Sequence, residues 1–85
     1  MMIPTVHLNG TSKQNMLEEL EVAHGAVNTA IDALRQVTVH GRDYYVQGEH
    51  AYLQARHEMD ARLAALVAVQ DDLLTMRVAI QTSFD

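Results

Sequence analysis

The sequence predicts an all-α protein: a long antiparallel helical hairpin with an extended N-terminal arm, assembled as a homo-oligomeric bundle. Three observations predict it. Two long segments carry apolar residues at alternating spacings of three and four. About ten residues with a glycine near each end separate these segments. The hydrophobic residues, 48% of the chain, are mostly Ala, Leu, Val and Met, with one Phe and no Trp, which is typical of helices packed along seams.

Residues 1–10 are predicted to form an extended arm. They contain the only proline, Pro4, and end in Asn-Gly, so they are not expected to be helical. Val6 and Leu8 alternate with polar residues, and Pro4 restricts the segment to an edge element. We expect the arm to lie along a neighbouring subunit of the bundle.

Residues 11–38 are predicted to form the first helix. Thr11 or Ser12 can cap it, and Gln14 stands three residues after Thr11 as in a capping box. The apolar positions repeat as a heptad seam. The seam residues are Met16, Leu20, Ala23, Val27, Ala30, Leu34 and Val37.

Residues 39–48 are predicted to form a loop, and residues 49–82 a second helix. Glu49 is expected in the first turn, where the helix dipole favours negative charge. The second seam is interrupted by Arg62, which has Leu63 beside it. It comprises Tyr52, Ala55, Met59, Arg62, Leu66, Val69, Leu73, Met76 and Ile80.

A second apolar row on the second helix predicts self-association. Helices of about 28–34 residues run ~40–50 Å and bury only the strip between them. The row is then left exposed, and large apolar patches usually have a partner; it comprises Leu53, Leu63, Val67 and Leu74. We expect other copies of the chain to cover it. The alternative is a monomer whose arm folds over the stripe, but ten residues are too few to cover it.

Size and charge limit the function classes. The 85 residues suffice for one domain, spanning residues 1–85. A net charge of −5 argues against binding of duplex nucleic acid, which requires basic surface. The chain lacks cysteine, its apolar stretches are too short to span a membrane, and its start does not resemble a signal peptide. We therefore expect a soluble protein of the cytoplasm.

The start of the first helix is a candidate anion site. Gly10, Thr11 and Ser12 offer backbone N–H groups and two hydroxyls at a helix N-terminus. The alternative is an ordinary turn and cap, because Ser and Thr are the usual capping residues.

The loop is a second candidate binding segment, with Arg42, Asp43, Tyr44, Tyr45 and Gln47 between two glycines. Arginine can bind phosphate or carboxylate through two hydrogen bonds, tyrosine can stack on a base, and Asp or Gln can bind its polar edge. The alternative is a solvated Arg–Asp pair with tyrosines closing the end of the bundle.

The remaining polar residues do not predict catalysis, a metal site or a cofactor. The five histidines form no HExxH pair, and His57 with Asp60 is a weak candidate for a metal-dependent hydrolase. His24, beside Gly25, is interpreted as partly buried packing, with the glycine allowing another helix to approach. His7 and His40 could join the anion site if the arm folds back.

Two stretches resemble a known family. IPTVHLNGTS at residues 3–12 and GRDYYVQG at residues 41–48 are similar to motifs of small uncharacterised proteins from tailed-phage genomes. Members share the arm, the Gly-Thr-Ser cap and a GRDYY-x-QG loop between two helices rich in Ala and Leu. They commonly have proline where this chain has Val46, which implies a looser loop here. The resemblance carries no activity with it.

A broader likeness is to phage counter-defence sponges, which are small helical oligomers that hold signal nucleotides. It implies a non-enzymatic phage protein that sequesters a small phosphorylated ligand, of cyclic-nucleotide or ADP-ribose type, in the host cytoplasm. Arg42 would then pair with phosphate, Tyr44 or Tyr45 would stack on the base, and residues 10–12 would donate to an anion. The alternative is a helical protein–protein interaction module, a phage inhibitor or assembly factor, that uses the second apolar row.

Overall fold

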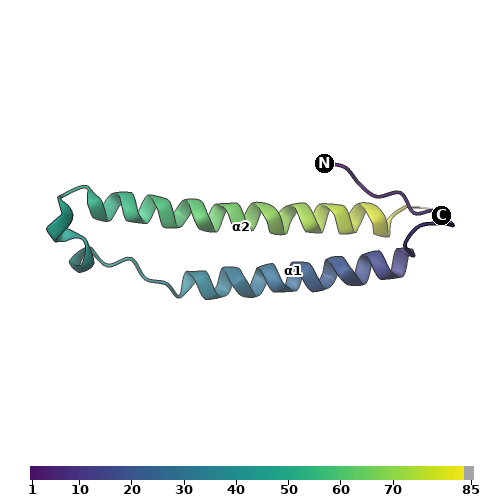
Figure 1. Cartoon of the computed structure of the whole chain (residues 1–85), viewed down its shortest axis with the longest axis horizontal. Coiled ribbons are helices and arrows are strands. Elements are labelled where there is room, and N and C mark those ends of the chain that lie inside the picture. Colours follow the sequence, from purple (N-terminus) through teal and green to yellow (C-terminus); the bar gives the residue numbers. More distant parts are fainter. Residues whose placement is uncertain (84–85) are drawn as a thin grey trace.

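A computed structural model describes residues 1–83 of the chain. Two helices, α1 (Lys13–Arg35) and α2 (Ala51–Gln81), lie antiparallel and form a rod of 62 × 20 × 17 Å (Figure 1). Two short 3-10 turns, η1 (Gly41–Asp43) and η2 (Tyr45–Gln47), lie in the connection. Residues 1–83 include no strand, so the all-helical hairpin is confirmed.

Ser12 alone caps α1. Its Oγ accepts a hydrogen bond from the backbone N–H of Asn15 at 3.1 Å. The predicted capping box starting at Thr11 is wrong, because Ser12 is the N-cap and the Gln14 side chain donates to Glu18 at 2.9 Å. This bond joins side chains one turn apart on the helix surface.

Both helices are shorter than predicted. α1 ends at Arg35 rather than at residue 38, because Val37, Thr38 and Val39 form a β-branched run that favours extended backbone. α2 begins at Ala51 rather than at residue 49. Glu49 therefore precedes the helix and lies 3.3 Å from the ring of His50, so its predicted place in the first turn is wrong.

The buried seams differ from the predicted ones at a few positions. Among residues 1–83 only Ile31 and Ile80 are buried, at 2% and 1% exposure. In α1, Ile31 takes the inner position while Ala30 is exposed, because the larger side chain gains more from burial. At two positions of α2 the seam shifts by one residue: Leu63 and Gln70 are half-buried, while the predicted Arg62 and Val69 are exposed.

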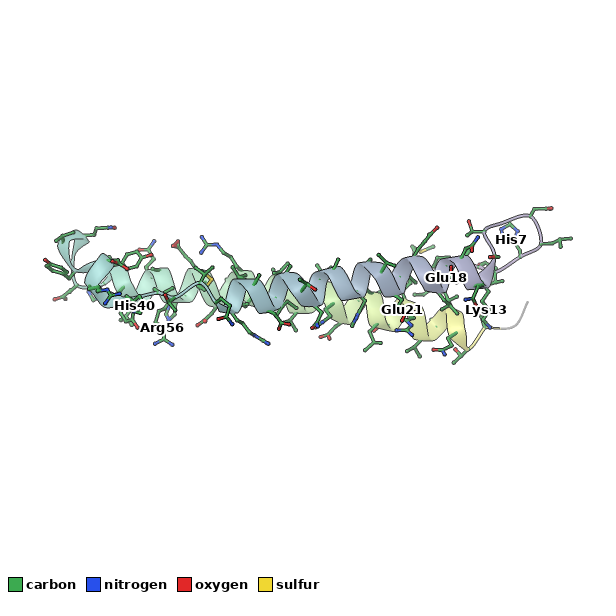
Figure 2. The ribbon with its side chains drawn as sticks, turned by 90° about the horizontal axis from the view of Figure 1, so that it is seen from below. His7, Lys13, Glu18, Glu21, His40 and Arg56 are labelled. Carbon is green, nitrogen blue, oxygen red and sulfur yellow. The ribbon has the colours of Figure 1, made fainter. Side chains whose placement is uncertain are left out.

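Three polar contacts join the helices, all between the open end of the hairpin and its middle. Lys13 Nζ donates to the carbonyl of Ser83 at 2.8 Å, and Arg77 lies 4.0 Å from Glu21. The amide of Gln70 donates to Asn28 Oδ1 at 3.1 Å, which explains why a polar residue occupies the seam. Figure 2 shows Lys13 and Glu21 near this end. From Thr29 to the loop, no described side-chain hydrogen bond or ion pair joins α1 to α2.

The N-terminal arm packs on its own chain. Pro4 lines a hollow of about 210 Å³ over the helix ends, with Met16 and Leu20 of α1 and Met76 and Ile80 of α2 on its other sides. The arm thus packs at the open end of its own hairpin, whereas we expected it to lie along a neighbouring subunit. Most of the rod remains uncovered by the arm (Figure 1).

The helices also bear on the predictions for His24 and Gly25. His24 is half-buried, as its interpretation as a packing residue predicts. Gly25 is exposed, and a Cβ built on it would have no neighbour within 4 Å, so no helix of this chain approaches it. Neither α1 nor α2 is long and apolar enough to cross a membrane.

Candidate functional site

The loop residues singled out by sequence do not converge. Arg42, Asp43, Tyr45 and Gln47 are exposed, with Tyr45 at 75%, while Tyr44 is half-buried. One tyrosine therefore packs inwards and the other faces solvent, as expected for a loop at the end of a bundle. None of the described side-chain hydrogen bonds or ion pairs involves these five residues.

Backbone hydrogen bonds hold the loop in shape. Asp43 N–H donates to His40 at 3.1 Å, Tyr44 to Gly41 at 3.0 Å, and Gln47 to Tyr44 at 2.9 Å. Gly48 then adopts φ 119° and ψ 163°, a backbone region open to glycine but not to other residues. The chain turns into α2 at this glycine.

The candidate anion site at Gly10, Thr11 and Ser12 lies beside a hollow of about 360 Å³, lined by Val6, His7, Leu8, Gly10, Ser12 and Lys13. His7 is therefore close to the site, as suggested for a folded-back arm. Its ring lies so near Gly10 that a Cβ there would come within 2.7 Å of Nε2. Ser12 is already used as the helix cap, which supports the ordinary-cap interpretation for this residue.

The two candidate sites lie at opposite ends of the rod. The loop closes one end of the hairpin, and the turn before α1 lies at the other, along a molecule 62 Å long (Figure 1). His40 likewise lies far from His7 (Figure 2). Within one chain, the two segments therefore cannot hold the same small ligand, and each is a separate candidate.

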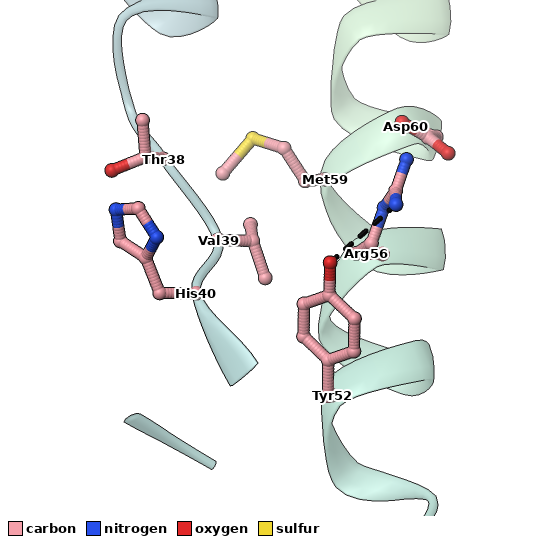
Figure 3. Close-up of a pocket in the computed structure, with 7 residues that line it drawn as sticks. All are labelled: Thr38, Val39, His40, Tyr52, Arg56, Met59 and Asp60. Carbon is pink, nitrogen blue, oxygen red and sulfur yellow. Dashed lines mark hydrogen bonds between the residues drawn. The ribbon is translucent and has the colours of Figure 1, made fainter. Parts of the chain in front are cut away.

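A groove that the sequence did not indicate lies beside the loop. It encloses about 300 Å³ between the extended segment 38–40 and the first turns of α2 (Figure 3). Its lining consists of Thr38, Val39, His40, Tyr52, Arg56, Met59 and Asp60. The signal in the sequence was the β-branched run after α1, because an extended segment is thinner than a helix and leaves space beside α2.

A metal-dependent hydrolase would need a cluster of metal-binding side chains. Among residues 1–83, no three His, Asp or Glu side chains lie close enough together to hold a metal ion. His57 and Asp60, the pair considered for a hydrolase, are both exposed on α2.

We found no protein-family model, no curated protein and no solved structure that matches this chain. The likeness to tailed-phage proteins and to nucleotide sponges therefore stays a prediction from the two sequence motifs.

Proposed function

We propose that the chain is a non-enzymatic helical interaction module that assembles by pairing the α2 helices of two copies. The observation that carries this proposal is an apolar row on α2 with symmetric spacing. Leu63, Val67, Leu74 and Val78 are separated by four, seven and four residues. We call these four residues the α2 row; three of them belong to the row predicted from sequence, and Val78 replaces Leu53.

The α2 row is accessible to a partner. Leu74 and Val78 are 45% and 48% exposed, while Leu63 and Val67 are half-buried. Steps of four and seven residues keep side chains on one stripe of a helix. The row therefore places two apolar pairs on one stripe of α2, half-buried at Leu63 and Val67 and exposed at Leu74 and Val78.

The symmetric spacing favours a second copy of this chain as the partner. In a twofold interface the same surface meets itself, so an antiparallel helix pair needs a pattern that is identical in both directions. With the axis between Gln70 and Asp71, Leu63 lies opposite Val78 of the other copy and Val67 opposite Leu74. Gln70 then lies opposite Asp71 of the other copy, and the two Asp71 side chains lie on either side of the axis.

The exposed area of the single hairpin also supports association. It exposes 6397 Å², whereas a compact monomer of 9.5 kDa exposes about 5,000 Å². The surplus exceeds the ~800 Å² that one partner contributes to an ordinary interface. Its radius of gyration, 18.8 Å, compares with about 12 Å for a compact domain of this length.

The test is the solution mass of wild-type and charged variants, measured by sedimentation equilibrium. We expect a dimer for the wild type and a monomer for Leu74→Glu, because the pairing would bury the glutamate. Val69→Glu is the matched control: Val69 is also 45% exposed on α2 but lies outside the α2 row. A monomeric wild type, or dissociation by Val69→Glu alone, would contradict the proposal.

A single engineered cysteine tests the register, because the chain has no cysteine of its own. Asp71→Cys lies next to the proposed axis, so mild oxidation should give a disulfide-linked dimer at high yield. Asp32→Cys, on the exposed surface of α1, should crosslink little under the same conditions. Equal yields from the two variants would rule out this register.

A further inference from the structure

The groove beside the loop has the features of a ligand site. One wall is the extended segment with Thr38 and His40, and the other is α2 with Tyr52 and Arg56 (Figure 3). We propose that this groove binds a small organic anion, a carboxylate or phosphate group on an apolar body. This site is independent of the α2 row and of the loop residues discussed above.

Arg56 supplies the anion-binding group. Its guanidinium lies 5.9 Å from the centre of the Tyr52 ring, and Nη1 donates to the phenol oxygen at a long 3.5 Å. None of the ion pairs among residues 1–83 involves Arg56. The aromatic contact orients the guanidinium without neutralising it, so its remaining N–H groups are available for two hydrogen bonds to an anion.

The opposite wall adds polar groups. His40 lies across the groove from Arg56, and neither residue takes part in a described ion pair. The His40 ring and the Thr38 hydroxyl are further hydrogen-bonding groups. Arg56 is therefore the anion-binding group, and Thr38 and His40 add polar lining on the side of the extended segment, with Val39 and Met59 between them and Arg56 (Figure 3).

The residues on the floor of the groove select the part of the ligand that carries the anionic group. Val39 and Met59 lie between the two polar walls (Figure 3). An aliphatic side chain and a thioether favour an apolar or aromatic body, and the ring of Tyr52 extends this surface. A volume of about 300 Å³ is at the lower limit of small-molecule sites, so the ligand is small.

Asp60 limits the charge that the groove accepts. It lines the groove one turn beyond Arg56 but makes no ion pair with it. A carboxylate here repels a bound anion, so it lowers affinity for any ligand of the proposed class. Removing its charge should therefore have the opposite effect to removing the charge of Arg56.

The test is a titration of the full-length protein, followed through its amide NMR signals, with phenyl phosphate and phenylacetate as probes. We expect saturable shifts at residues 38–40 and 52–60. The two probes separate phosphate from carboxylate preference. Inorganic phosphate has the charge without the apolar body, and benzyl alcohol has the body without the charge; both should bind at least about tenfold more weakly.

Variants of single charges decide the assignment. Arg56→Gln should weaken binding about tenfold or more, the loss expected for a charged hydrogen bond, and Asp60→Asn should strengthen it about twofold to threefold. Arg62→Gln, on the outer surface of α2, should change nothing. Binding that survives Arg56→Gln, or shifts spread along the rod, would overturn the proposal. Unchanged signals for residues 13–35 show that each variant is folded.

Discussion

The open end and the loop end of the hairpin are held by different means. At the open end, Lys13 contacts Ser83, Glu21 contacts Arg77, and Pro4 lies over Ile80. At the loop end the described side chains make no polar contact between the helices, and the exposed tyrosine and groove lie there.

The difference follows from chain connectivity. At the loop end, the connection of residues 36–50 links the helices covalently, so the entropy lost in bringing them together is already limited by loop closure. At the open end no covalent link does this, and side-chain contacts must supply the attraction. Polar contacts between the helices are therefore concentrated at the open end, while a groove lies at the loop end.

The largest expected effect comes from the two buried isoleucines. Ile80→Ala and Ile31→Ala should each lower the free energy of unfolding by about 2–5 kcal/mol, because each leaves a cavity. Denaturant titration followed by circular dichroism at one protein concentration measures this. The matched Ile→Val variants should cost only about 0.5–1.5 kcal/mol. Amide exchange should accelerate at the open end for Ile80→Ala alone; uniform acceleration would remove the distinction between the ends.

A smaller effect is expected in the loop. Gly48→Ala should lower the free energy of unfolding by about 1–3 kcal/mol, because alanine adopts the backbone conformation at φ 119° only with strain. Gly41→Ala is the control: its backbone is ordinary, and the nearest atom to a new Cβ is Tyr52 Cγ at 4.0 Å. Thermal melts of both variants should separate them clearly. Equal melting temperatures would show that the loop end does not depend on this turn.

The smallest effect should come from the tie at the open end. Lys13→Gln removes the charged hydrogen bond to the Ser83 carbonyl and should cost about 1 kcal/mol. Amide exchange should rise in residues 79–82 and stay unchanged in residues 51–58. Gln14→Ala, which loses only an exposed bond within α1, should cost a few tenths of a kcal/mol. Faster exchange at residues 51–58 would contradict a local tie.

The hairpin could be predicted from sequence because heptad spacing reports a helix face directly. Positions such as Leu20, Val27 and Leu66 follow this rule. The exchange of Ala30 for Ile31, and of Val69 for Gln70, could not be predicted, because neighbouring positions flank the same seam and the other helix selects between them. Gln70 is inside because Asn28 lies opposite it, a pairing between residues far apart in the chain.

The candidate sites were harder to predict, for a physical reason. Arg42 and Ser12 were identified as residue types suited to anions, but their separation along the rod depends on the hairpin and not on either motif. The groove residues are scattered between Thr38 and Asp60 and form no motif. They meet only because α1 ends early, so the informative feature was a helix boundary.

Because α1 ends early, part of α2 has no helix beside it. α2 has 31 residues and α1 has 23, so the longer helix extends beyond the shorter by about 12 Å at 1.5 Å per residue. Residues 38–40 are extended and cover about 10 Å of this overhang. This segment therefore acts as a spacer: a residue added or removed there would change the width and depth of the groove while the helix seams keep their register. The groove and the helical scaffold can vary independently of each other.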